Sequence, residues 1–366
     1  MKKHAIIPIF IPHQGCPNDC VFCNQRNITA RTAIPDAFDL RSTIEKYLPT
    51  LTGRGLETIE VAFFGGSFTG LDMDLQSMYL SVAKEYKDKG LISKIHLSTR
   101  PDYINARILD NLKYYSVDII ELGVQSFDEE VLRLSNRGHG VACVYESAAL
   151  IKKYGFELGL QLMLGLPGDS LEKDLFSAGE LVKIGPSIAR LYPTIVIKDT
   201  QLYDMYLKGT YHPLTQEEAV HITKEMYKII SGAGINIIRV GLKSTDVIND
   251  SDQGAIAGGT FHPAFRQLVE GEIAKDMLEC QLIDYLSENE KNIEVRKSFE
   301  NSKHVENCEK MKTIYFCSRN ESFSNMVGNN KINKKYFADK FPCVRIEYII
   351  DNSIGLNTYI LKEGKK

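Results

Sequence analysis

Three cysteines lie within eight residues near the N-terminus, and their spacing constrains this chain more than any other feature. Cys16, Cys20 and Cys23 form a CxxxCxxC pattern shortly after the apolar run Ala5–Ile11. Three thiolates cannot complete a four-ligand metal site, but they can hold three irons of a 4Fe–4S cube and leave the fourth iron open. An open iron can bind a small molecule and pass it an electron, whereas a cluster with four protein ligands usually only relays electrons.

Two other interpretations of the three cysteines are a zinc site with a ligand from elsewhere and a group of buried thiols. Zinc sites favour paired CxxC or mixed Cys/His sets, and His13 is the one histidine close to this motif. Buried thiols do not explain three cysteines on a loop beside Gly15 and Pro17. The open cluster is therefore the favoured hypothesis.

Composition indicates an ordinary globular protein without a charge-driven partner. The chain has 366 residues and a net charge of −3, so nothing in its overall charge attracts it to nucleic acid or membrane. Its eight cysteines are not distributed as a disulfide framework, which favours a reducing compartment. Cys308, Cys317 and Cys343 lack the tight spacing of a second cluster with His304, so we predict ordinary thiols there.

The N-terminal apolar run resembles a signal peptide only slightly. Pro8 and Pro12 interrupt it and no small-residue cleavage site follows, so a buried first strand is the better interpretation. No apolar stretch is long enough to span a bilayer. We therefore expect a cytoplasmic protein with no membrane partner.

Apolar runs alternate with helical patterns up to about residue 240. Continuous Val, Ile, Leu and Phe runs predict strands that are covered on both faces, and capping signals such as Thr215 with Glu218 predict helices between them. The predicted strands are Ala5–Ile11, Thr58–Phe64, Lys94–Ser98, Asp118–Val124, Leu158–Leu164 and Ala189–Ile197. This order predicts an α/β fold with a parallel sheet, which is either open or a closed barrel.

The pattern changes after residue 241. We predict a core over residues 1–241, a loop and helical extension over 242–290, and a small α+β segment over 291–366. In the core, cysteines, glycines and polar residues follow the predicted strands at their carboxyl ends. Chemistry in such folds collects at that edge of the sheet, so we expect these residues to share one mouth.

At this point the sequence resembles the radical S-adenosylmethionine superfamily over about residues 5–240. Its signature is CxxxCxxC with an aromatic residue before the last cysteine, here Phe22. Three later segments match the superfamily in order: Phe-Phe-Gly65-Gly66-Ser67, Glu-Leu-Gly123-Val-Gln125-Ser126-Phe127 and Leu-Met-Leu-Gly165-Leu-Pro-Gly168. They occur in the branch that holds oxygen-independent coproporphyrinogen III oxidases and the Elongator catalytic subunit.

The resemblance implies a partial (β/α)6 TIM-like barrel that carries a 4Fe–4S cluster and S-adenosyl-L-methionine. Reductive cleavage of that cofactor would give methionine and a 5′-deoxyadenosyl radical, with Cys16, Cys20 and Cys23 as cluster ligands and catalytic residues. It further implies cofactor contacts from Phe22 to the adenine, from Gly65, Gly66 and Ser67 to the methionine amino group, from Gln125 to the ribose and from Arg137 to the carboxylate. Ser98 and Gln161 stand where the coproporphyrinogen oxidases carry acidic residues, and are included as cofactor contacts.

Arg190-Leu-Tyr192-Pro193-Thr194 and the residues up to Leu202 resemble the sixth strand of the Elongator catalytic subunit. The resemblance therefore implies an oxidoreductase-type radical enzyme for RNA, specifically tRNA, modification, with ferredoxin or flavodoxin as electron donor. The alternatives are a tetrapyrrole-type small-molecule substrate and, in a different class, a non-catalytic iron–sulfur electron-transfer or metal-binding protein.

For several further polar residues the sequence allows both a functional and a structural interpretation. Arg190 and Lys198 either face a substrate or form structural ion pairs. His139 either moves a proton near the mouth or is an incidental loop histidine. The lysines of Gly328–Tyr336 either touch RNA phosphates or form a solvated helix face.

Overall fold

The computed structural model describes residues 4–11, 16, 20–23, 34–242, 254–289 and 313–364. These residues divide into two compact units, and the boundary along the chain falls between Pro263 and Ala264. Each unit is described by itself below.

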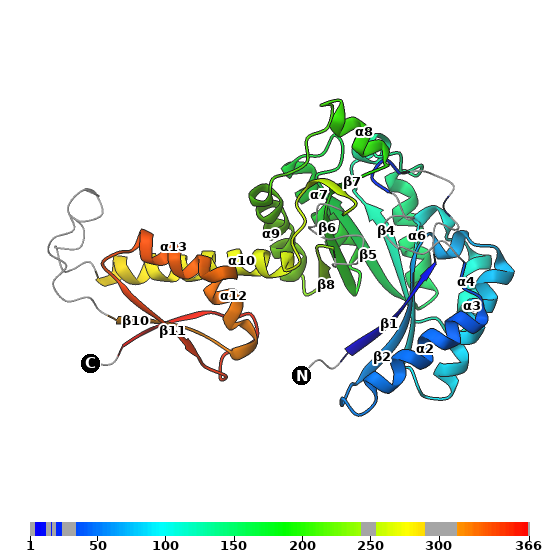
Figure 1. Ribbon diagram of the computed structural model, residues 1–366, viewed down its shortest axis with the longest axis horizontal. Coiled ribbons are helices and arrows are strands. Elements are labelled where there is room, and N and C mark those ends of the chain that lie inside the picture. The colour runs from blue at the N-terminus through cyan, green and yellow to red at the C-terminus, as the bar shows by residue number, and fades with distance from the viewer. Residues whose placement is uncertain are drawn as a thin grey trace. The chain divides into compact units, whose positions relative to one another are not determined.

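A curled sheet of parallel strands forms the centre of the first unit (Figure 1). Its strand order in the described part of the chain is β1-β2-β3-β4-β5-β6-β8, so consecutive strands are neighbours and the sheet winds in one direction, as in a partial barrel. The strands are β1 (His4–Ile11), β2 (Thr58–Gly65), β3 (Lys94–Thr99), β4 (Ile119–Gln125), β5 (Glu157–Leu164), β6 (Ile188–Pro193) and β8 (Asn236–Val240). The predicted partial TIM-like barrel is confirmed.

Two details of this sheet differ from the sequence-based prediction. The run Ala189–Ile197 was expected to be one strand, but it divides into β6 and β7 (Ile195–Ile197), and β7 pairs with β9 (Ile256–Gly259) in a separate sheet. The division falls at Pro193 and Thr194, where Pro193 lacks the amide hydrogen that a continuing central strand needs. Strand β8 was not predicted, because its five residues include Arg239 and Asn236.

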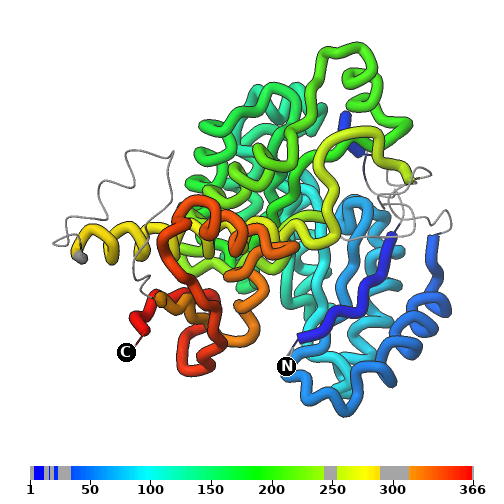
Figure 2. The backbone as a smooth tube through the Cα atoms, turned by 60° about the vertical axis from the view of Figure 1, so that its left-hand side comes forward, coloured from blue at the N-terminus to red at the C-terminus, as the bar shows by residue number. Residues whose placement is uncertain are grey.

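Helices lie outside the curl of the sheet, as Figures 1 and 2 show. Capping boxes begin two of them: Asp36 with Asp39 at α2, and the predicted pair Thr215 with Glu218 at α9. The helices of this unit are α2 (Ala37–Leu51), α3 (Met73–Asp88), α4 (Ala106–Tyr114), α5 (Glu129–Leu134), α6 (Val141–Lys153), α7 (Leu171–Ile184), α8 (Gln201–Leu207) and α9 (Gln216–Gly232). Within the described residues, no helix is both long enough and apolar enough to cross a bilayer.

The two faces of the sheet have different composition. On β5, Leu158, Leu160, Leu162 and Leu164 are buried and alternate with half-buried residues that include Gln161. Neighbouring side chains on a strand point to opposite faces, so the leucines share the face that packs on the helices. The alternate residues form the concave face, which is polar on several strands.

The second unit is a small α+β domain. The long helix α10 (Phe265–Asn289) and helices α12 (Phe323–Val327) and α13 (Ile332–Lys340) accompany a three-stranded sheet of order β11-β10-β12. Strands β10 (Thr313–Ser318) and β11 (Arg345–Ile350) are parallel, and β12 (Ile360–Glu363) is antiparallel to β10. Phe316, Phe337 and Leu278 are central to its apolar core.

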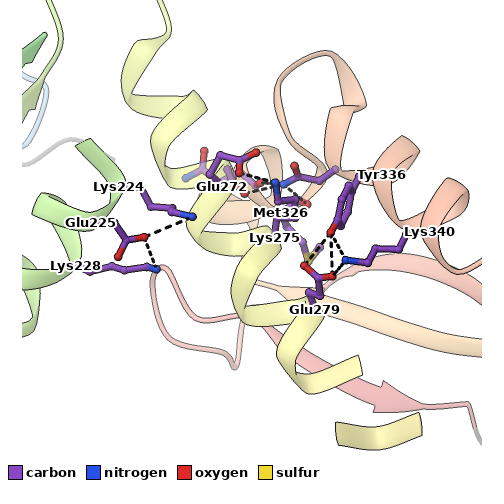
Figure 3. Close-up of polar contacts among 12 residues, drawn as sticks. Lys224, Glu225, Lys228, Glu272, Lys275, Glu279, Met326, Tyr336 and Lys340 are labelled. Atoms are coloured by element: carbon purple, nitrogen blue, oxygen red, sulfur yellow. Dashed lines mark hydrogen bonds and ion pairs between the residues drawn. The ribbon is translucent and has the colours of Figure 1, made fainter. Parts of the chain in front are cut away.

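A polar cluster between α10 and α13 adjoins the basic segment of this unit (Figure 3). Glu279 of α10 accepts hydrogen bonds from Tyr336 and from Lys340 of α13. Lys334 lies over the ring of Tyr348 at 5.7 Å from its centroid. These contacts account for Lys334 and Lys340, and both interpretations of the Gly328–Tyr336 lysines stay open.

The outlying cysteines differ from one another. Cys143, Cys280 and Cys317 are free thiols, and Cys317 is buried. Cys343 is disulfide-bonded, so the prediction of an ordinary thiol is wrong there. The reason is a tertiary approach to a second cysteine that sequence spacing does not reveal. His304 and Cys308 lie outside the described residues.

Gly65 allows β2 to end against β1. Its φ of +112° is a conformation that side-chain-bearing residues rarely adopt, and an added Cβ would lie 2.3 Å from the Ile11 carbonyl oxygen. Gly53 has a φ of +81° but nothing within 4 Å of an added Cβ. We expect Gly65→Ala to lower the free energy of unfolding by about 2–4 kcal/mol, against about 1 kcal/mol for Gly53→Ala. Urea unfolding of both variants measures this, and equal losses would contradict the close approach.

Candidate active site

The cysteine loop is fixed by backbone hydrogen bonds on both sides. The Val21 amide donates to the Ser135 carbonyl at 3.1 Å, and the Leu202 amide at the start of α8 donates to the Val21 carbonyl at 2.7 Å. The Cys23 amide donates to the Cys20 carbonyl at 2.9 Å, which closes a turn between two of the cysteines. Strand β1 therefore delivers the motif to the carboxyl edge of the sheet, between segments that follow β4 and β7.

Two buried arginines lie against the thiol of Cys20. Arg137 Nη1 lies 3.1 Å from Cys20 Sγ, and Arg100 Nη1 lies 3.9 Å from it. Asp102 fixes the Arg100 guanidinium through two hydrogen bonds of 2.9 Å. Burial raises the pKa of the Cys16 thiol, and the positive charges of Arg100 and Arg137 oppose that rise. On balance the pKa of Cys16 is raised in the absence of metal. The two guanidiniums nevertheless place positive charge where a metal-bound thiolate would lie.

The donor set fits an iron–sulfur cube better than a single ion. Among the described residues, no three His, Cys, Asp or Glu side chains are close enough to share one metal ion. In a cube each thiolate binds a different iron, so its three cysteines lie farther apart than the ligands of one ion. The two arginines would also offset the negative charge of a thiolate-bound cluster. His13, the histidine that a zinc site could use, lies outside the described residues.

The glycine-rich segment after β2 is tied to its neighbours on both sides. The Gly66 amide donates to the Ile11 carbonyl at 3.0 Å. Ser67 is buried, and its hydroxyl lies 2.9 Å from Thr99 Oγ1 and accepts from the Arg100 amide at 3.3 Å. The segment that the sequence assigns to the cofactor therefore adjoins both the end of β1 and the arginine that contacts Cys20.

Arg137 contacts the end of β4, which is in turn joined to β5. Arg137 Nη2 donates to the Gly123 carbonyl, and a Cβ on Gly123 would lie 3.1 Å from the Gln125 amide nitrogen. Gln125 is buried with a φ of +75°, at a register shift between β4 and β5, and it accepts from the Gln161 amide at 3.3 Å. Backbone strain of this kind clusters at functional sites. Gln161 is thus joined to Gln125, and both Gln125 and Arg137 adjoin Gly123. Their predicted role as cofactor contacts stays a prediction.

Phe22, His139 and Ser98 occupy different surroundings. Phe22 packs against an apolar cluster that includes Val196 and Leu202. His139 Nε2 lies 3.4 Å from Arg137 Nη2; burial and that positive charge lower the pKa of His139 to about 4, so its imidazole is neutral at neutral pH. Ser98 donates to Glu121 at 3.4 Å rather than to the cysteine region.

The Gly165-Leu-Pro-Gly168 segment has a structural role in packing. An added Cβ would lie 2.6 Å from Leu214 at Gly165 and 2.4 Å from Leu134 at Gly168, and both residues have positive φ. The Gly165 carbonyl accepts a hydrogen bond of 2.7 Å from Tyr211. This motif therefore shapes the turn after β5, where only glycine fits.

A row of ionisable side chains crosses the concave face, and most of its members were not predicted as site residues. His96 of β3 is fully buried between Glu60 of β2 at 3.6 Å and Glu121 of β4 at 3.5 Å. Arg190 Nε of β6 lies 2.8 Å from Glu121. Arg190 was a predicted candidate, and the structure shows it in this ion pair. Glu60, His96 and Glu121 could have been placed on one face from the sequence, because alternate residues of a strand point to the same side of the sheet.

The row shifts the pKa of its members. Burial lowers the pKa of His96, but the two carboxylates outweigh burial, and the net pKa is raised. Burial raises the pKa of Glu121, but Arg190 and His96 outweigh it and hold the pKa below its usual value. Each charge in the row is thus stabilised by its neighbours.

Comparison with known proteins defines the class to which this fold and cysteine loop belong. Residues 10–176 match the Radical SAM superfamily model, and residues 186–275 match the model of the Radical SAM C-terminal domain. The chain is a member of the radical SAM superfamily, whose cofactors are a 4Fe–4S cluster and S-adenosylmethionine.

Within the superfamily, the similar proteins include Elongator-type enzymes. The tRNA uridine(34) acetyltransferase of Methanocaldococcus infernus is 25% identical over 320 residues, which cover 76% of this chain and 58% of that protein. Elongator complex protein 3 of Bos taurus is 29% identical over 320 residues, covering 76% and 57%. The solved structure of archaeal Methanocaldococcus infernus Elp3 with an N-terminal deletion has a TM-score of 0.60 at 22% identity, covering 76% of this chain and 64% of that one. The chain spans just under three fifths of the length of these two relatives.

The buried row makes stability depend on pH. Because the folded pKa of His96 is raised, the stability it contributes is fully present below the unfolded pKa of about 6.5 and is lost as the pH rises through the folded pKa. We expect His96→Gln to reduce the free energy of unfolding by about 1–3 kcal/mol at about pH 6 and by less at about pH 9. Urea unfolding at both pH values measures this. His221→Gln, on the exposed face of α9, is the control, and a His96→Gln loss that grew with pH would contradict the assignment.

Proposed function

We propose that Cys16, Cys20 and Cys23 hold a 4Fe–4S cluster in this chain and that the neighbouring strand ends hold S-adenosylmethionine. When bound, these groups supply reductive cleavage of the cofactor's C5′–S bond. The proposed cofactor contacts are Phe22, Gly65, Gly66, Ser67, Ser98, Gln125, Arg137 and Gln161.

The observation that carries this proposal is the contact of Arg137 with both Cys20 and Gly123. One guanidinium joins a thiol of the N-terminal loop to the end of β4, although these residues are more than a hundred positions apart. Gln125 adjoins Gly123 as well, and Gln161 donates to Gln125. The proposed cluster ligands and cofactor contacts are thus linked near the carboxyl edge of the sheet, where parallel α/β folds carry their active sites.

The protein residues orient and shield this chemistry. Asp102 holds Arg100 beside Cys20, so positive charge is already in place before a cluster is loaded. Cys20, Arg100 and Arg137 are all buried, which limits the access of water and oxygen to the cluster side. Neutral His139 lies within 3.4 Å of Arg137 and supports the orientation of its guanidinium.

We further propose that the substrate is tRNA and that a ferredoxin or flavodoxin of the cytoplasm supplies the electron. The support is the similarity to relatives that carry tRNA uridine(34) acetyltransferase in their names. Because the chain spans only part of their length, the proposal covers the radical step on RNA and makes no claim of acyl transfer.

Loss of one cluster ligand tests the proposed function. After anaerobic reconstitution with iron and sulfide, we expect about four irons per chain, and dithionite with S-adenosylmethionine should yield 5′-deoxyadenosine. Cys20→Ala should lose iron, the cluster's visible absorbance and all 5′-deoxyadenosine, because a thiolate beside Arg137 is removed.

Cys280→Ala is the matched control, since it removes an exposed free thiol from α10. It should retain wild-type iron and turnover. A loaded wild-type cluster that forms no 5′-deoxyadenosine would reject the enzyme proposal, and undiminished loading of Cys20→Ala would reject the ligand assignment.

A further inference from the structure

The row of ionisable side chains on the concave face continues beyond Arg190 to an arginine without an ion-pair partner within the described ranges. Glu60, His96, Glu121 and Arg190 follow one another within ion-pair distance from β2 to β6. On the next strand, β8, Arg239 is half-buried and has no ion-pair partner among the residues that the structure describes. The row therefore ends in a positive charge that the protein itself does not neutralise.

A β-bulge places Arg239 beside Arg190. Ala189 pairs with Ile237, but Arg190 pairs with Arg239, so Ile238 is an extra residue in β8. In unbroken register, Arg190 would oppose Ile238, and Arg239 would oppose Leu191, which belongs to the helix-facing side of β6. The bulge thus brings a second guanidinium to the concave face. Bulges commonly re-aim a side chain next to active sites.

This arrangement is unfavourable in the absence of an anion. Like charges directly opposite one another on neighbouring strands are destabilising. Glu121 already pairs with Arg190 and is shared with His96. Arg239 therefore lies opposite Arg190 without a carboxylate of its own in the described chain, and a bound anion would stabilise the two guanidiniums.

The position of Arg190 is fixed on three sides. Its Nε lies 2.8 Å from Glu121, its Nη1 donates to Tyr192 at 3.3 Å, and its guanidinium lies 4.8 Å from the centroid of Phe64. The Arg190 side chain is only 12% exposed. Burial raises the pKa of the Tyr192 hydroxyl, while both Arg190 and Arg239 act to lower it, which places that hydroxyl within reach of both charges. A rigid guanidinium with a hydroxyl beside it suits a tetrahedral oxyanion.

The arginine pair adjoins the proposed cofactor residues. Arg190 is the register partner of Gln161 on β5, and Gln161 donates to Gln125. A ligand group held by β6 and β8 would therefore lie one strand away from the residues assigned to S-adenosylmethionine. That is the side of the sheet from which a substrate would approach the cofactor.

We propose that Arg190 and Arg239, with the hydroxyl of Tyr192, form an anion site on the concave face that binds a phosphate group of the RNA substrate. The RNA part of this inference rests on the proposed function. The bulge, the uncompensated charge of Arg239 and the fixed guanidinium of Arg190 carry the anion site itself.

The test compares Arg239→Gln with wild type in the reconstituted, S-adenosylmethionine-bound protein. The first probe is an unmodified tRNA transcript, titrated at several salt concentrations. We expect Kd to rise about 5–10-fold and the slope of log K against log salt to fall by about 0.7–0.9, as for one lost phosphate contact. Arg107→Gln, which removes an equal charge from the exposed face of α4, is the matched control and should bind as wild type.

The second probe separates the anion site from the choice of substrate. Uridine 5′-monophosphate should bind wild type about tenfold more tightly than uridine, and Arg239→Gln should abolish that difference. If tRNA binds but Arg239→Gln behaves like Arg107→Gln with both probes, the anion site is rejected and the proposed function stands. If tRNA does not bind but the monophosphate preference depends on Arg239, the RNA substrate is rejected and the anion site stands. Circular dichroism and the Tm establish that Arg239→Gln is folded.

Discussion

The contact between buried arginines and the Cys20 thiol is the interaction on which the rest of the site depends. Residues 20–23 belong to no helix or strand, so their position comes from what their side chains and backbone amides contact. Arg137 joins Cys20 to the end of β4, and Asp102 holds Arg100 against the same sulfur. Placing two guanidiniums in a buried region is costly unless each is paired or hydrogen-bonded. Here the carboxylate, the carbonyl of Gly123 and the thiol supply those partners, which is why loop, strand end and charge form one unit.

The sequence was sufficient for the elements whose signals are local. Apolar runs predicted six strands of the first sheet, and the pair Thr215 and Glu218 marked the start of α9. Local sequence patterns were not sufficient where contacts with distant segments determine the structure. Strand β8 is short and contains Arg239, so its pattern resembles a loop until β6 is known to lie beside it. The disulfide at Cys343 likewise depends on a tertiary approach.

The candidate site likewise contains residues that a sequence motif reveals and residues that only tertiary contacts reveal. Cysteine spacing and the glycine pair at a strand end pointed to Cys20 and Gly65, because ligand spacing and backbone freedom are visible in the order of residues. Gln125 was proposed from the resemblance to a known family. Arg100 could have been noticed, since it directly follows β3, but its contact with Cys20 spans eighty positions and has no motif. In the sequence, His96 has nothing that distinguishes it from an ordinary strand residue. Its significance comes from the lateral register of three strands, which a single sequence does not encode.

The concave face explains why a partial barrel suits this chemistry. A closed TIM barrel fills its interior with layers of branched apolar side chains, which leaves no room on that side for a ligand. In this unit the same positions carry Glu60, His96, Glu121 and Arg190, and Gly159 leaves space where a Cβ would lie 3.1 Å from Glu121. Charges there remain stable only if each is neutralised within the row or by something bound to it. Arg190 is paired with Glu121. Arg239, which the bulge places beside Arg190, is therefore the guanidinium on this face that an anionic ligand would neutralise.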